Sequence, residues 1–488
     1  MEKINEITCK ILNSAAGIIL CAVSLAVFYL PYELRIIPEV LDIAVYVADI
    51  CAVLLILAFF ALYISRMRLF RDNFFLWAAL AFIAVLLYST ELNMADDMQG
   101  ALGFKGLAAV FIAMMAAVFF RVNPKKYILT AFFVLMIYVV MNAYTVFAYW
   151  GVGMWEEYGQ YRNVFFSLVG NYNGGIEYVI PMILCGLAYA HLYGAWLQIL
   201  NYPLMILNLI MAVKCDSLTQ ELAFILILAA MVLGDILRLS DKAAGVVRHI
   251  FSPVILIAAD IIIFLIVVVK QITSWVSIFG IDPDFHKRSH IWSMSLKLFE
   301  SHPLWGNGQE SVVMEASKIT GYAHSHCTYL EIMYKTGTVG TVIMLIMTGL
   351  MIFSILKLSK HRTAYIISAV TGIFALAGIV ESYPLVCVIM CFGLAYYICR
   401  NADNAVIFEN VIADDDVPSE NVTAHDAAPS ENVIAHDAAP SENEIADDAP
   451  ADAACQCAEN EQALDDDIRN GLARAVAEMC SRDPENDI

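Results

Sequence analysis

Histidine is concentrated in one short stretch of this chain, together with arginine. Five of the ten histidines lie between residues 286 and 326, and Arg288 lies among them: His286, His290, His302, His324 and His326. Histidine is the usual general base near neutral pH, and the planar fork of arginine binds phosphate oxygens in pairs. Residues of these types can take a proton from a hydroxyl group and hold a phosphate beside it.

The same histidines suggest a metal site as an alternative. His286 and His290 are four residues apart, so on a helix they would share a face and could bind a metal with His324 and His326. The H-E-x-x-H pattern of zinc enzymes does not occur in this stretch. We therefore expect neither a metal nor another cofactor.

Four short motifs run in order through and beyond this stretch. They are R-x-x-x-W (Arg288, Trp292), P-x-x-G-x-G (Pro303, Gly306, Gly308), H-x-x-Y-L (His326, Tyr329, Leu330) and G-x-x-G (Gly337, Gly340). The ordered set resembles the O-antigen ligase and polymerase superfamily, which are bacterial membrane glycosyltransferases acting on undecaprenyl-diphosphate-linked glycans. Cys327 stands where the family usually has Asn.

The resemblance implies roles for several of these residues. His326 would be the general base, and Arg288 would bind the diphosphate of the lipid-linked donor, without a metal. Charge develops on that diphosphate as the glycosidic bond breaks, and a fixed cation can stabilise it. His324 and Trp292 would contact substrate, and Glu381 resembles an acidic family position that would orient His326 or bind sugar.

Further candidates lie upstream of the histidine-rich stretch. The family often has an Arg followed by G-N-x-N at a helix start, and Arg162 and the letters GNYN from Gly170 onward match it. The resemblance makes Arg162 a second cation and Asn171 and Asn173 sugar ligands, although both asparagines also suit a turn or a helix cap. The family often has a Ser-Arg pair before the eighth span, and this sequence has no Arg there. Lys214 is the nearest basic residue, but it offers a point charge in place of the planar fork of an arginine.

The composition indicates that a membrane protein carries these residues. Of the 488 residues, 60% are apolar and only 16% are charged, against about half and about a quarter in soluble domains. Residues 1–400 hold 25 acidic and 25 basic side chains, whereas residues 401–488 hold 23 acidic and 3 basic ones. A soluble enzyme is excluded, and without a basic stripe we expect no nucleic-acid partner.

Twelve apolar segments, most of them near the length that spans a bilayer, lie between residues 8 and 399. The loops on one side carry 12 Lys and Arg, and the short loops on the other side carry 3. This predicts an all-α polytopic protein of the bacterial cytoplasmic membrane, in contact with membrane lipids and with both termini in the cytoplasm. Residues 1–400 form the transmembrane body, including one large extracytoplasmic loop at about 270–335 that folds partly into helices.

The acidic segment 401–488 is predicted to be a disordered cytoplasmic tail. An 11-residue repeat begins at Pro418, Pro429 and Pro440, and it is too polar to form a core. Apolar residues at helical spacing from Leu464 to Met479 could form a short helix that docks a cytoplasmic partner. A solvated tail with a transient helix is the simpler interpretation.

The expected function is transfer or polymerisation of an undecaprenyl-diphosphate-linked glycan onto a sugar hydroxyl of a glycan or glycolipid acceptor. The reaction would occur at the outer face of the membrane, in the assembly of surface polysaccharide. A transporter or flippase is an alternative, but it would place ionisable groups at the midplane, where Asp49 and Asp260 are the main examples. A non-catalytic scaffold with a recruiting tail is a second alternative, and it leaves the His and Arg stretch unexplained.

Overall fold

The computed structural model describes most of the membrane body. The described residues are 2–31, 34, 37–63, 74–93, 104–148, 167–169, 174–194, 196–236, 252–270, 288–308, 325–357 and 362–399. Their regular structure is helical apart from an isolated bridge residue at Ser167. The predictions for Arg162, Asn171, Asn173, His324 and the tail lie outside these residues. The all-α class of the body is confirmed.

The N-terminal half forms six labelled helices: α1 (Glu2–Asn13), α2 (Ala15–Phe28), α4 (Pro38–Tyr63), α5 (Phe74–Leu92), α7 (Phe104–Val122) and α8 (Pro124–Ala148). The junction of α7 and α8 shows how local sequence sets a boundary. Asn123 accepts a hydrogen bond at Oδ1 from the backbone N–H of Lys126 (3.0 Å), which caps the new helix. Pro124 follows at the first helical position, where its missing N–H costs nothing.

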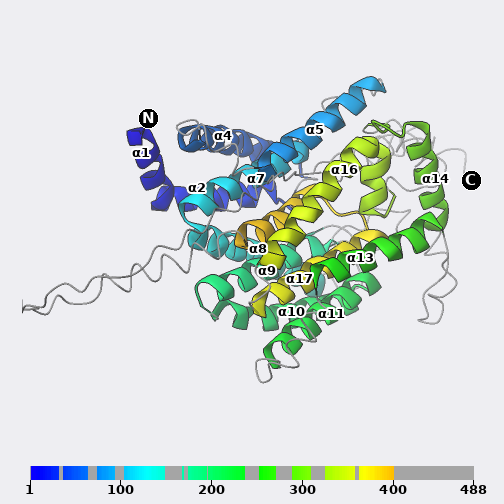
Figure 1. Ribbon diagram of the computed structural model, residues 1–488. Helices are drawn as coiled ribbons and strands as arrows, with labels where there is room; N and C mark the ends of the chain where they lie inside the picture. Colours follow the sequence, from blue (N-terminus) through cyan, green and yellow to red (C-terminus); the bar gives the residue numbers. More distant parts are fainter. Residues whose placement is uncertain are drawn as a thin grey trace, which may run out of the picture.

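The C-terminal half forms α9 (Gly175–Leu192), α10 (Trp196–Lys214), α11 (Leu218–Ile236), α13 (Pro253–Phe264) with a π-helical end η3 (Leu265–Val269), α14 (Arg288–Ser301), α16 (Thr328–Lys357) and α17 (Arg362–Val380). A last apolar helix covers Leu385–Cys399. α14 lies within the predicted outer loop, so that loop contains a helix. Figure 1 shows α14 on the opposite side of the molecule from α1 and α4.

Five described helices are long and apolar enough to cross a membrane: α4, α5, α8, α10 and α16. A sixth candidate is the pair α1 and α2, which is bent by 69° at Ser14. Each of the twelve predicted segments coincides with helix, but several of these helices are shorter than a full span. The protein is therefore a multi-pass membrane protein, and the count of twelve spans is not confirmed.

α16 is broken inside its length, and a loop from elsewhere fills the break. Gly337 has φ 64° and ψ −161°, which interrupts the helix. The N–H groups of Thr338 and Val339 donate to the carbonyls of Pro303 (2.8 Å) and Leu304 (3.2 Å). The carbonyls of Tyr334 and Lys335, which those N–H groups would otherwise bind, accept from the N–H groups of Asn307 (2.7 Å) and Gly308 (3.0 Å).

The inserted loop explains why the break is tolerated. The two N–H groups and the two carbonyls released at Gly337 have replacement partners in residues 303–308, which offsets the cost of losing their helical hydrogen bonds. The loop is also held by the residue that follows α5, because Asn93 Nδ2 donates to the Gly306 carbonyl (3.0 Å). The P-x-x-G-x-G and G-x-x-G motifs are thus two halves of one backbone arrangement.

Candidate active site

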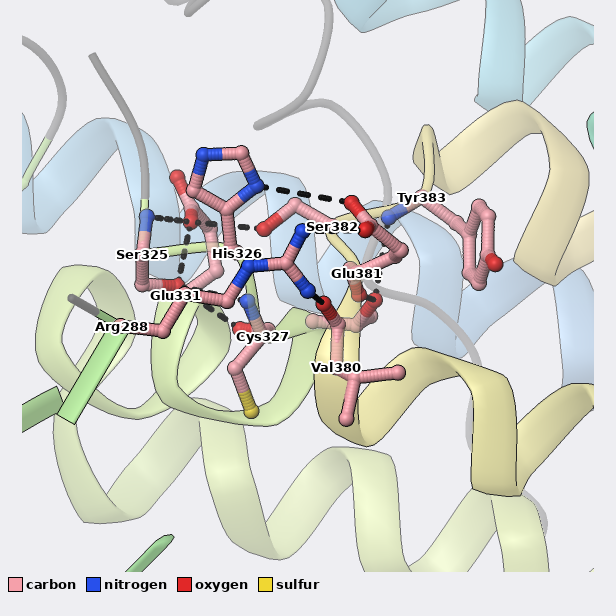
Figure 2. A network of polar contacts seen from close by, with 10 residues as sticks. Arg288, Ser325, His326, Cys327, Glu331, Val380, Glu381, Ser382 and Tyr383 are labelled. Carbon is pink, nitrogen blue, oxygen red and sulfur yellow. Dashed lines mark hydrogen bonds and ion pairs between the residues drawn. The ribbon is translucent and has the colours of Figure 1, made fainter. Parts of the chain in front are cut away.

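Glu381 connects the two residues that the sequence analysis placed in catalysis. Arg288 Nη2 donates to Glu381 Oε1 (2.6 Å), and His326 Nδ1 lies 3.4 Å from Glu381 Oε2. Arg288 also donates to the backbone carbonyl of Val380. Figure 2 shows the carboxylate beside both the guanidinium and the imidazole. Three residues from three separate segments therefore form one ionic cluster.

Arg288 is positioned by the helix that it begins. It is the first residue of α14, and Trp292, one turn later, is fully buried in an apolar cluster with Val267 and Val268 of η3. The cluster is completed by Cys327 just before α16, by Leu330 in α16 and by Ile379 in α17. The apolar packing fixes the first turn of α14 against α16 and α17, and so directs the guanidinium to the end of α17.

His326 adopts a backbone conformation that is uncommon for a residue with a side chain. Its φ is 49°, in the left-handed region. Such conformations are held by their surroundings and occur often at functional sites. In Figure 2 the second ring nitrogen, Nε2, points away from Glu381. With Nδ1–H donated to the carboxylate, Nε2 is the basic nitrogen of the ring.

The Glu381 carboxyl stays ionised at neutral pH despite its burial. It lies just beyond the last residue of α17 and is only 4% exposed. Burial raises the pKa of this carboxyl, but Arg288 and His326 lower the pKa by more, so that the net pKa lies below the ordinary value of 4.5. A permanent negative charge beside His326 favours the protonated imidazolium that a general base becomes during reaction.

The segments that carry His326 and Glu381 are also tied through the backbone. Thr328 donates to the Glu381 carbonyl twice, from its N–H (3.1 Å) and from Oγ1 (2.9 Å). The N–H of Tyr383 donates in turn to Thr328 Oγ1 (3.0 Å). The turn before α16 and the turn after α17 therefore form one unit, although 55 residues separate His326 from Glu381.

A second buried carboxylate, Glu331, lies under the same turns. Its Oε2 accepts from the N–H of Ser325 (3.0 Å), from Ser325 Oγ (2.8 Å) and from Ser382 Oγ (3.3 Å). Its Oε1 accepts from Tyr334 OH (3.1 Å) and forms an ion pair with Lys335 Nζ (2.9 Å). Glu331 belongs to none of the sequence motifs described above. The spacing of Glu331 and Lys335, four residues apart at the start of a helix, was the available signal.

Other predicted residues have different surroundings. Trp292 is fully buried by apolar neighbours, so in this structure its side chain supports the site by packing. Lys214 is the last residue of α10 and is exposed. The substrate contacts predicted for these two residues stay predictions.

Cys327 is buried where the family usually has Asn. Its side chain packs in the cluster with Trp292, and burial raises the pKa of its thiol to about 12. The thiol is therefore protonated at neutral pH and cannot act as a nucleophile there. In this chain the position supports the packing beneath His326.

The metal alternative has no support in the described ranges. Within them, no group of three or more His, Cys, Asp and Glu side chains is arranged to hold a metal ion. His286 and His324, which the four-histidine alternative needs, lie outside those ranges.

Comparison with known proteins connects this site to a family. The family model for O-antigen ligase matches residues 204–345, which confirms the resemblance to the O-antigen ligase and polymerase superfamily. The matched segment contains Arg288, His326 and Glu331, whereas Glu381 lies beyond its end. Neither the curated proteins nor the solved structures gave a match.

Proposed function

Because residues 204–345 match the O-antigen ligase family, we propose that this protein transfers a glycan from undecaprenyl diphosphate to a sugar hydroxyl during surface-polysaccharide assembly. The observation that carries the proposal is the cluster in which Glu381 contacts both His326 and Arg288. A neutral imidazole next to a fixed carboxylate is suited to general-base work, and a guanidinium is suited to a diphosphate.

In the proposed reaction, His326 Nε2 takes the proton of the acceptor hydroxyl. The hydroxyl oxygen forms a bond to the anomeric carbon of the donor sugar, and the bond from that carbon to the diphosphate oxygen breaks. Undecaprenyl diphosphate leaves with the electron pair, and Glu381 stabilises the imidazolium that remains.

Arg288 would bind the leaving diphosphate with the part of its fork that Glu381 does not occupy. A guanidinium carries five N–H donors, and its described hydrogen bonds go to Glu381 and to the Val380 carbonyl. Glu381 thus holds the cation in place while the remaining donors meet the developing negative charge. The reaction would take place at the outer face of the cytoplasmic membrane, with a glycan or a glycolipid as acceptor.

The test is complementation of a strain that lacks the protein with wild type, His326→Ala or His290→Ala. His290 is exposed on α14 and serves as the matched control. Surface polysaccharide is separated on a gel, and the membrane level of each variant is measured. We expect His326→Ala to be present at the wild-type level without restoring the glycan, whereas His290→Ala restores it.

The gel also separates the two reactions of the superfamily. A ladder that collapses to single repeat units identifies a polymerase, whereas complete chains that stay on the lipid identify a ligase. Wild-type glycan with His326→Ala would overturn the base assignment and favour the transporter or the scaffold.

A further inference from the structure

The residue before the base and the residue after its carboxylate partner share one acceptor. Ser325 precedes His326, and Ser382 follows Glu381. Both serine hydroxyls donate to Oε2 of Glu331, at 2.8 and 3.3 Å, and the N–H of Ser325 donates to the same oxygen at 3.0 Å. Figure 2 shows these contacts meeting beneath the imidazole. One carboxylate oxygen is therefore linked to both sides of the His326–Glu381 pair.

The contact to Ser325 supports the unusual backbone of His326. The Ser325 hydroxyl oxygen also lies 2.8 Å from the Cys327 carbonyl oxygen and accepts from the Cys327 N–H (3.2 Å), which closes the turn around His326. The left-handed φ of His326 needs such external support. Without the acceptor at Glu331, the Ser325 N–H and hydroxyl would lose their shared partner, and the imidazole would lose its fixed position.

The charge of Glu331 is balanced on its other oxygen. Lys335 is fully buried, and its Nζ lies 2.9 Å from Oε1. A buried carboxylate without a counterion would be costly, and a second unbalanced negative charge near Glu381 would add repulsion. Lys335 thus allows Glu331 to remain a strong acceptor in an apolar surrounding.

From this arrangement we propose that Glu331 is a positioning residue, which sets the distance between His326 and Glu381 by holding Ser325 and Ser382 on one carboxylate oxygen. The inference rests on the proposed function, since it assigns Glu331 to the step that His326 performs. A buried ion pair with only a structural role is the competing explanation.

Two double variants separate these explanations. The first combines Glu331→Gln with Lys335→Met, and the second combines Glu331→Leu with Lys335→Met. Both remove the ion pair and leave positions 331 and 335 uncharged. They differ because glutamine keeps one carbonyl oxygen for Ser325 and Ser382, whereas leucine keeps none. Glycan transfer from a purified undecaprenyl-diphosphate donor is measured in nanodiscs, with kcat and KM determined separately and with the unfolding temperature of each variant.

We expect the leucine variant to have a kcat about 10- to 100-fold below that of the glutamine variant, since small misplacement of a catalytic group has effects of this size. KM should differ little, because Glu331 contacts Ser325 and Ser382, to which the proposed reaction gives no part in binding the substrate. Equal kcat values for the two variants at similar unfolding temperatures would overturn the inference.

A second pair of variants covers the case in which the leucine variant does not fold. Ser325→Ala with Ser382→Ala removes the hydroxyl donors and leaves the Glu331–Lys335 pair intact, and Ser301→Ala on the exposed end of α14 is the control. We expect kcat to fall about tenfold only in the first. If His326→Ala is inactive but the double serine variant keeps the wild-type kcat, only the role of Glu331 is refuted. If His326→Ala is active, the proposed function itself is refuted.

Discussion

Glu381 is the residue on which the candidate site depends most, because it contacts both Arg288 and His326. Its side chain is 6% exposed and that of Arg288 is 13% exposed, so water screens their ion pair only weakly. Removing one member of such a pair leaves the other charge without its partner, at a cost of about 3–5 kcal/mol. The stability of the site is therefore coupled to the ionisation of this carboxyl.

That coupling predicts a pH dependence for Glu381→Gln. The pKa of the Glu381 carboxyl is lower in the folded protein than its ordinary 4.5, so its contribution to stability is present above pH 4.5 and is lost as the pH falls below it. Wild type should unfold at a higher temperature than the variant throughout the range from about pH 5.5 to 8. The margin should shrink below about pH 4.5.

Thermal unfolding of both proteins in one detergent, at five or six pH values, measures this margin. Lys297→Gln on the exposed side of α14 is the control, and its margin should stay near zero throughout. A margin that grows as the pH falls below about 4.5 would mean that the carboxyl is already protonated in the folded protein.

At the scale of the element, the break in α16 determines where the site lies. Residues 328–336 form a separate helical segment that carries Glu331 and Lys335 and begins two residues after His326. The segment is held at its far end by loop 303–308 and at its near end by Thr328. In an unbroken α16 the backbone groups around Gly337 would bind one another and not loop 303–308. The turn that holds His326 would then lose this support.

Gly337→Ala should therefore destabilise the protein strongly. A Cβ at this position would lie 2.4 Å from the Leu304 carbonyl oxygen and 2.5 Å from the Gly306 nitrogen, both of which are backbone atoms that cannot turn aside. The φ and ψ of Gly337 are also in a region that is nearly restricted to glycine. We expect a loss of about 3 kcal/mol or more, together with loss of activity.

The same helix offers the matched control. Gly349 has no atom within 4 Å of an added Cβ, and alanine there should be neutral or stabilise the helix by up to about 1 kcal/mol. The unfolding temperatures of the two variants in detergent are compared with wild type. Equal behaviour of the two glycine variants would show that the break is not required.

At the scale of the whole molecule, sequence predicted the helices better than the contacts between them. One of the twelve expected apolar segments is α4 (Pro38–Tyr63), and it is helical because a long apolar run has few other structures available in a membrane. The pairing of His326 with Glu381 joins two turns 55 residues apart. The family resemblance suggested that pairing, while no local pattern could establish it.

Glu331 was missed for a related physical reason. Its acceptor role depends on Ser382, which comes from a different turn, and a helical Glu four residues before a Lys is ordinarily an exposed pair. The bend at Ser14 was also missed. Hydropathy averages over a window and does not register a change of direction between α1 and α2.

The charge of the loops predicts the orientation of the whole protein, and this prediction can be tested with one matched pair of cysteine substitutions. Lys297 on α14 and Lys125 on α8 are both exposed. The excess of basic residues in the loops around Lys125 predicts that it faces the cytoplasm and that α14 faces outward. The described native cysteines are buried, except for Cys9 and Cys215, which are partly buried. These two cysteines and the three in the tail are first replaced by serine.

A membrane-impermeant maleimide added to spheroplasts should label Lys297→Cys at once and Lys125→Cys only after the membrane is opened. This outcome places Arg288 at the outer face, because it shares α14 with Lys297, and it fits a lipid-linked donor that is used outside the cytoplasm. The reverse pattern would place the whole cluster in the cytoplasm and would contradict the reaction proposed at the outer face. Labelling of both positions from outside would mean that an even number of spans separates them, and the helix assignment between α8 and α14 would then be wrong.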